Sequence, residues 1–164
     1  MTVSHIFFGF VFEEHQPELI CNTLAMEDIM RQEKINIIAG CAGILIAAAG
    51  GLCLGFSMDP YFEKGFYALP LGRYLLKAGH THGMPIALYN LIIGSLLPNL
   101  ELTDTGKKWC SRLAVCAFIM PIGLVLRGIT GGAMTFAPVV LAGALCFLSS
   151  IVLVMKGVPG NNPN

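Results

Sequence analysis

The sequence predicts an all-α membrane protein, a transmembrane four-helix bundle. Of its 164 residues, 55% are hydrophobic and only 12% are charged, whereas a soluble domain carries about twice that charged fraction. No Asp, Glu, Lys or Arg occurs in residues 35–58, 113–126 or 128–155. Because about 20 apolar residues cross the hydrocarbon core of a bilayer, we expect these stretches to span a membrane. The lipid bilayer is then the protein's principal partner.

Residues 1–34 precede the first span and are expected to be an interfacial segment. Residues 5–12 (HIFFGFVF) are apolar, but they lack a basic start and Glu13 and Glu14 follow at once. This arrangement is unlike a signal peptide with its small-residue cleavage site. We expect the segment to lie at the membrane surface or against a partner.

The first span is expected over about residues 35–58. Small residues recur four apart in it, at Gly43, Ala47, Gly51 and Gly55. This spacing places them on one stripe of a helix, and such stripes let helix backbones approach closely in lipid. We therefore expect the helix to pack against a neighbour, either inside the subunit or between subunits.

The second span is expected to end near Leu97 and to begin before Pro85, as early as Leu71. Residues 84–97 alone are too short to cross a bilayer, so the helix must start earlier, with the proline as a kink or near its first turn. The preceding segment, residues 59–77, mixes aromatic side chains with Lys and Arg. That mixture is typical of the headgroup level.

The third span is expected from Trp109 to Arg127 and the fourth over residues 133–155. Residues 35–156 thus form the predicted four-helix transmembrane domain. The tail at 157–164 is rich in Gly, Pro and Asn, a composition that predicts a disordered end.

The Lys and Arg residues are divided unevenly between the two sides of the predicted membrane domain. One side holds Arg31, Lys34, Lys107, Lys108, Arg112 and Lys156. The other holds Lys64, Arg73, Lys77 and Arg127. The positive-inside rule then places both termini in the cytoplasm, with a bacterial inner membrane as the expected location. Because the net charge is zero and no basic patch occurs, nucleic acid is not an expected partner.

The most informative polar residues lie at the start of the second span, in the motif Gly-His-Thr-His-Gly at 79–83. Ionisable groups at such a position in a membrane protein are functional candidates, and imidazole is a common ligand of haem iron, copper and zinc. The six cysteines form no C-x-x-C or C-x-x-C-H pattern, which excludes c-type haem attachment and the usual zinc motifs. No carboxylate lies inside a predicted span, so hydrolytic and proton-pumping chemistry is not expected.

The two histidines of this motif cannot both bind one metal from one continuous helix, because residues two apart point to nearly opposite sides. One of His80 and His82 can ligate while the other forms a hydrogen bond or faces a neighbouring chain. The flanking glycines, including Gly83, leave room for a flat macrocycle. Two other interpretations stay open: the histidines are interfacial residues that pair with headgroups or cap the helix, or they serve another metal or proton transfer.

The residues around the second and third spans resemble those of a known enzyme family. They are the run Lys77-Ala-Gly-His-Thr-His-Gly-Met-Pro85, then Leu97-Pro98 at the helix end, and Asp104, Lys107, Lys108 and Arg112 at the start of the next helix. This arrangement, over about residues 77–127, resembles the styrene oxide isomerase family. Its members are small four-helix membrane proteins that assemble as trimers, bind haem b and convert epoxides to carbonyl compounds.

The resemblance implies a cofactor, a substrate class and a set of site residues. Haem b would be held by His80 as the axial metal ligand, with His82 and Gly83 also in the cofactor site, and ferric iron would act as a Lewis acid on a small apolar epoxide. The polar residues available for catalysis are Tyr89, Asn90 and Arg127. For Arg127, the role of a helix end whose side chain reaches the interface is favoured over contact with a substrate oxygen or haem propionate. A homotrimer is the implied assembly.

A second functional hypothesis comes from a different class. The chain can be a small accessory or electron-transfer subunit of a larger membrane complex, in which both histidines or neither bind haem. The small-residue stripe of the first span would then be its docking face. Two axial ligands favour electron transfer, whereas one open coordination position favours substrate chemistry.

Overall fold

A computed structural model describes residues 17–56 and 70–160, with side chains described from Met26 onward. Within these ranges the chain is helical apart from short turns and contains no strand, which confirms the predicted all-α class. Three earlier predictions lie wholly or partly outside the described residues. They concern the apolar N-terminal stretch, the aromatic segment after the first span and the end of the tail.

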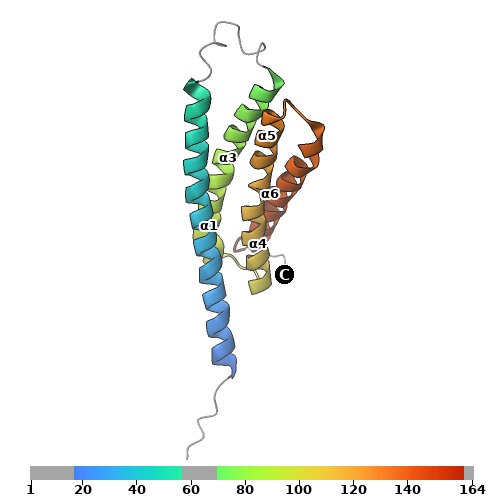
Figure 1. Cartoon of the computed structure of the whole chain (residues 1–164). Helices are drawn as coiled ribbons and strands as arrows, with labels where there is room; N and C mark the ends of the chain where they lie inside the picture. The colour runs from blue at the N-terminus through green and yellow to red at the C-terminus, as the bar shows by residue number, and fades with distance from the viewer. Residues whose placement is uncertain (1–16, 57–69, 161–164) are drawn as a thin grey trace, which may run out of the picture.

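The helices in chain order are α1 (Pro17–Phe56), α3 (Leu71–Leu96), α4 (Asp104–Cys116), α5 (Ile119–Ile129) and α6 (Ala137–Gly157), with short 3-10 helices η2 (Leu97–Asn99) and η3 (Met134–Phe136). Helices α4 and α5 follow one another almost in line and form one long rod (Figure 1). Helix α3 packs against both α1 and α5, and α6 packs against α4 and α5.

Three helices in the described part of the chain are long and apolar enough to cross a membrane: Met26–Phe56, Asp104–Ile129 and Met134–Gly157. They correspond to the predicted first, third and fourth spans, and they support a membrane protein. Helix α3 has 26 residues and a length of about 39 Å, but it is not among the three. This length is enough to cross a bilayer, so α3 is excluded by its composition: its histidines and other polar residues lower its hydropathy.

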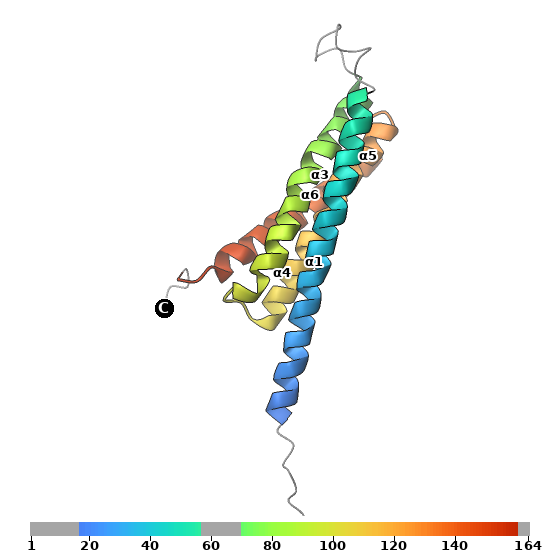
Figure 2. The ribbon, with the colours of Figure 1, turned by 90° about the vertical axis from the view of Figure 1, so that its left-hand side faces the viewer.

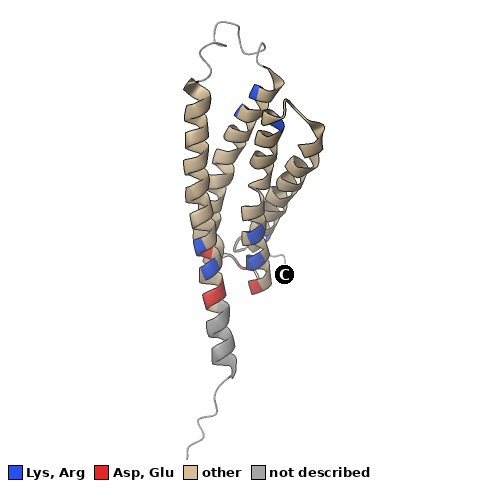
Figure 3. Cartoon of the chain, viewed as in Figure 1, with Lys and Arg blue, Asp and Glu red and all other residues tan. Residues whose placement is uncertain are grey.

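Charged residues in the described part of the chain lie at two levels of the structure and leave a charge-free zone between them (Figure 3). Helix α1 carries no charged residue from Ile35 to Phe56, a length of about 33 Å at 1.5 Å per residue. The hydrocarbon core of a bilayer is about 30 Å thick. The Pro17 end of α1 and the Gly157 end of α6 lie at the same end of the structure (Figure 1).

The helix boundaries differ from the predicted ones in two places. Helix α1 begins at Pro17, well before residue 35, so part of the segment predicted as interfacial continues the helix. That part extends beyond the lower ends of the other helices (Figures 1 and 2). The predicted third span is divided between α4 and α5, because Pro121 has no N–H to bond the carbonyl of Ala117. There the backbone forms hydrogen bonds between residues three apart instead of four. The N–H of Met120 donates to the carbonyl of Ala117, and the N–H of Phe118 donates to the carbonyl of Val115.

Close approach of α1 to α3 depends on the small residues of the first span. A side-chain carbon at Gly43 would overlap Phe118 and Ala87, and one at Gly51 would overlap His80. The stripe therefore packs inside the subunit, which decides between the two predicted alternatives for these positions. Gly55, the last residue of the stripe, has nothing within 4 Å of where its side chain would stand.

Candidate functional site

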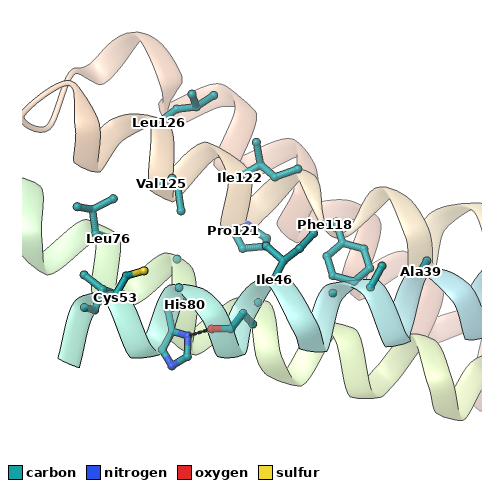
Figure 4. Close-up of a pocket in the computed structure, with 17 residues that line it drawn as sticks. Ala39, Ile46, Cys53, Leu76, His80, Phe118, Pro121, Ile122, Val125 and Leu126 are labelled. Carbon is teal, nitrogen blue, oxygen red and sulfur yellow. Dashed lines mark hydrogen bonds between the residues drawn. The ribbon is translucent and has the colours of Figure 1, made fainter. Parts of the chain in front are cut away.

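A cavity of about 690 Å³ lies between α1, α3 and α5, in the half of the structure nearer the Phe56 end of α1 (Figure 4). Cavities that bind small molecules and cofactors usually measure about 300–1,000 Å³ and are mostly apolar. Aliphatic side chains such as Ile46, Ile122 and Val125 form the walls. No Asp, Glu, Lys or Arg is among the described residues that line it, so the cavity suits an uncharged, apolar molecule.

Packing of α3 against its two neighbours produces this cavity. Helix α5 approaches α3 closely at Gly79, where a side-chain carbon would lie 2.7 Å from Val125 Cγ2. Helix α1 approaches α3 through its small-residue stripe, and the ring of Phe118 lies against Gly43 at one end of the cavity. Between these contacts α1 and α5 stay apart, and their apolar side chains face one another across the open space.

His80 is the one histidine that lines the cavity among the described residues. Its Nδ1 lies 2.7 Å from the carbonyl oxygen of Ala47 on α1. A carbonyl oxygen only accepts, so Nδ1 must donate, and in a neutral imidazole this leaves a lone pair on Nε2. The ring rests on the backbone of α1 at Gly51 rather than pointing toward Ile122 and Val125 on α5 (Figure 4).

The structure places Gly83 at the cavity and His82 away from it. Gly83 is buried one turn beyond Gly79, and a side-chain carbon there would lie 3.7 Å from Pro121 Cβ and 3.9 Å from Ala47 Cβ. His82 is exposed on a different side of α3 and does not line the cavity. Of the three predicted cofactor-binding residues, two therefore come together at the cavity.

Tyr89 and Asn90 lie further along α3 and make structural contacts outside the cavity. The Tyr89 hydroxyl is 2.9 Å from Ser150 Oγ on α6, and its ring meets that of Phe147 edge to face at 5.0 Å. Asn90 is fully buried, and its Nδ2 donates to the carbonyl of Ile86 at 3.0 Å and to that of Ala114 at 2.9 Å. Neither residue lines the cavity, so their predicted catalytic role gains no support from their positions.

Arg127 lies in the last turn of α5. Its Nε donates to the carbonyl of Ala133 at 3.3 Å, and its Nη2 lies 3.3 Å from Met134 Sδ. These contacts hold the end of α5 against the start of the next segment. Arg127 does not line the cavity, so the structure favours the second of its two predicted roles, that of a helix end.

Buried amides and hydroxyls in the other half of the structure were not singled out from the sequence. Asn36 Nδ2 donates to Ser111 Oγ at 2.5 Å, and the Ser111 hydroxyl donates to Gln32 Oε1 at 3.0 Å. Between α6 and α4, the Ser150 hydroxyl donates to the carbonyl of Cys110 at 3.0 Å. Asn36, an amide inside a charge-free stretch, was the available signal for this network.

The donor set at the cavity fits one kind of metal cofactor better than others. In the described part of the chain, no three His, Cys, Asp or Glu side chains are grouped so as to hold a metal ion. A haem iron takes its four equatorial ligands from the porphyrin and needs only an axial side chain from the protein. His80 is the described lining residue that has such a nitrogen, Nε2, although its ring lies against α1 at Gly51 in this structure.

Comparison with known proteins gives no independent assignment. No family model, no curated protein and no solved structure matches this chain. The function must therefore be argued from the cavity and from His80.

Proposed function

We propose that this chain is an integral membrane protein of four crossing helices that binds haem b through His80. We further propose that it converts a small apolar epoxide into a carbonyl compound. The observation that carries the proposal is the 2.7 Å bond from His80 Nδ1 to the Ala47 carbonyl. Histidines that bind metals usually donate their other ring N–H to a carbonyl or carboxylate, which fixes the tautomer. The resemblance to styrene oxide isomerases in the Lys77–Pro85 motif supports the choice of cofactor and reaction.

The proposed membrane arrangement extends the three apolar helices to include α3. Helix α3 packs against both α1 and α5, so its polar residues are partly shielded from lipid, as functional polar groups in membranes are. The Pro17 end of α1 and the Gly157 end of α6 lie at the same end of the structure (Figure 1), which supports both ends on one side of the membrane. The Lys and Arg distribution makes the cytoplasm that side in this proposal. The bacterial inner membrane and a homotrimer remain part of this proposal.

The chain's own residues would have three tasks in this reaction. The Ala47 carbonyl orients the imidazole of His80. Aliphatic walls, including Ile122 and Val125, bind the apolar body of the substrate and exclude water, which would otherwise open an epoxide to a diol. Ferric haem, when bound, supplies a Lewis acid that polarises an epoxide oxygen. The described lining contains no carboxylate or Lys, so the protein offers no strong acid of its own there.

Visible absorption of the detergent-purified protein tests the haem part directly. We expect a Soret band in the wild type, loss of that band in His80→Ala, and a retained band in His82→Ala, because His82 lies away from the cavity. A wild-type protein that takes up no haem when expressed with ample haem supply would overturn the proposal. Loss of the band in His82→Ala alone would move the ligand by two residues.

The spin state in the same spectrum separates the two functional hypotheses. A high-spin ferric spectrum indicates one axial ligand and an open face, as the isomerase requires. A low-spin spectrum with two axial imidazoles favours the accessory or electron-transfer subunit instead. Conversion of an aryl epoxide to its aldehyde or ketone by protein in vesicles, measured by chromatography against His80→Ala, tests the reaction.

A further inference from the structure

We infer that Gly51 of α1 is a positioning residue for His80: the missing side chain at this position lets the imidazole reach the Ala47 carbonyl and so fixes Nε2 as the lone-pair nitrogen. The inference deepens the proposed function, because it names what orients the proposed iron ligand. It concerns two groups on α1, a helix that the sequence motif around His80 does not include.

Helix geometry explains why these two positions act together. In an α-helix the carbonyl of one residue points along the axis toward the residue four positions later. The Ala47 carbonyl therefore points toward residue 51. A donor that approaches this carbonyl from a neighbouring helix must pass over the surface at residue 51, where a side chain would normally stand.

The observed distances show that the ring occupies this space. A side-chain carbon on Gly51 would lie 2.5 Å from Cε1, 2.9 Å from Nε2 and 3.2 Å from Nδ1 of His80. Real Cβ atoms essentially never approach other heavy atoms to less than 3.0 Å. The imidazole is rigid and is held at 2.7 Å by its bond to Ala47, so even a methyl group must turn the ring and lengthen that bond.

The adjacent glycine supplies a matched control. Gly50 lines the cavity, and nothing lies within 4 Å of where its side chain would stand. Gly50→Ala and Gly51→Ala add the same methyl group to the same turn of α1, and both gain the same helix propensity. Only the second methyl meets the imidazole, so any difference between the two variants reports that contact.

Nitrogen-15 NMR of the haem-free protein, labelled at histidine and held in detergent at about pH 8, where imidazoles are neutral, tests the inference without any cofactor. We expect His80 to carry its proton on Nδ1, and we expect this signal to disappear in His80→Ala. Gly50→Ala should keep the signal and Gly51→Ala should lose it. An Nδ1–H tautomer that persists in Gly51→Ala overturns the inference.

Thermal unfolding of the double variant guards against a general loss of folding. If the methyl group disturbs only the imidazole contact, Gly51→Ala should lower the unfolding midpoint in the wild type but hardly at all in a His80→Ala background. Such a dependence is the signature of coupled residues. Equal costs in both backgrounds overturn the inference. Loss of the Nδ1–H tautomer in Gly50→Ala as well would overturn the inference, because the effect would then not depend on the contact at Gly51.

Haem titration separates this inference from the proposed function. If haem binds, Gly51→Ala should weaken its affinity by about 10–100-fold, the usual effect of losing the partner that orients a metal ligand. Gly55→Ala, which lies outside the lining and meets nothing within 4 Å, should leave it unchanged. A wild type that shows the NMR behaviour but binds no haem overturns the proposed function and leaves the role of Gly51 standing. Wild-type binding that is unaffected in Gly51→Ala overturns the role of Gly51 alone.

Discussion

Asn36 on α1 and Ser111 on α4 are both fully buried, and the amide of the first donates a 2.5 Å hydrogen bond to the hydroxyl of the second. The hydroxyl donates in turn to Gln32, so one serine connects two successive turns of α1. At the other end of α1, the Ala47 carbonyl receives His80. Polar contacts thus hold α1 to its neighbours in both halves of the structure, while small residues allow the close approach between them.

Ser111→Ala is expected to destabilise the protein by about 0.5–2 kcal/mol, because a buried interhelical hydrogen bond contributes about that much in membrane proteins. Ser95→Ala is the control, since Ser95 is exposed and its hydroxyl bonds only within α3, to the carbonyl of Leu91. Reversible unfolding in mixed micelles measures both. Equal stabilities of the two variants would show that the Asn36 contact contributes nothing.

Gly79→Ala and Gly83→Ala are expected to differ, although both change one glycine to alanine on α3. The methyl group at position 79 would lie 2.7 Å from Val125 Cγ2 and 3.1 Å from the carbonyl of Pro121, whereas that at position 83 meets only ordinary contacts of 3.7 Å and more. Overpacking of this kind costs about 1–3 kcal/mol. Unfolding midpoints should therefore fall for Gly79→Ala and stay unchanged or rise for Gly83→Ala. The reverse order would contradict the observed packing of α3 on α5.

Gly143→Ala is expected to weaken the contact between α5 and α6. The added carbon would overlap the backbone of Met120, at 2.7 Å from its Cα, and a backbone cannot turn aside as a flexible side chain can. We expect a loss of about 1–3 kcal/mol, measured by thermal unfolding against Gly55→Ala, whose methyl meets nothing within 4 Å. An unchanged unfolding midpoint in Gly143→Ala would mean that α6 lies further from α5 in the protein than this structure shows.

Tyr89→Phe is expected to reduce stability modestly and to leave the haem spectrum unchanged. The change removes the 2.9 Å contact with Ser150 but keeps the ring against Phe147, so about 0.5–1.5 kcal/mol should be lost. Absorption spectra and unfolding curves of the same preparation separate the two effects. A normal unfolding curve with lost epoxide conversion would instead assign Tyr89 the catalytic role predicted from the sequence.

Cysteine labelling tests the proposed topology. In a variant without native cysteines, Glu27→Cys and Val158→Cys should be protected from an impermeant maleimide in intact spheroplasts, while Thr130→Cys should react. All three positions are exposed, so access from the aqueous side decides the result. Reaction of Glu27→Cys and protection of Val158→Cys would place the two ends on opposite sides.

The sequence predicts the elements of this fold well where a bilayer restricts the choice. Long charge-free stretches locate α1, the α4–α5 rod and α6, because charged groups are excluded from hydrocarbon. The same argument does not predict where a helix begins or ends. Helix α1 starts at Pro17, before the charge-free stretch, because a helix can continue into water. The division of the rod could have been read from Pro121, since a proline inside a helix removes a backbone bond.

The candidate site was predicted only in part. The motif on α3 indicated His80 and Gly83, and both line the cavity. It also indicated His82, which does not line the cavity, because residues two apart on a helix point to nearly opposite sides. The walls contributed by α1 and α5 could not be predicted, because apolar residues such as Val125 look the same whether they face lipid or a cavity. Which helices are neighbours is a tertiary property, and no local pattern encodes it.

The polar residues of α3 affect how this helix can be inserted into a membrane during synthesis. It is the one long helix in the described chain without the apolar composition of a membrane span, and polar side chains make insertion of a single helix costly. The insertion machinery should therefore release α3 into lipid together with α1, as a helical hairpin that has already paired its small-residue surface. A chain truncated after α3 is expected to insert as this hairpin, whereas α3 without α1 should remain bound at the translocon or be degraded.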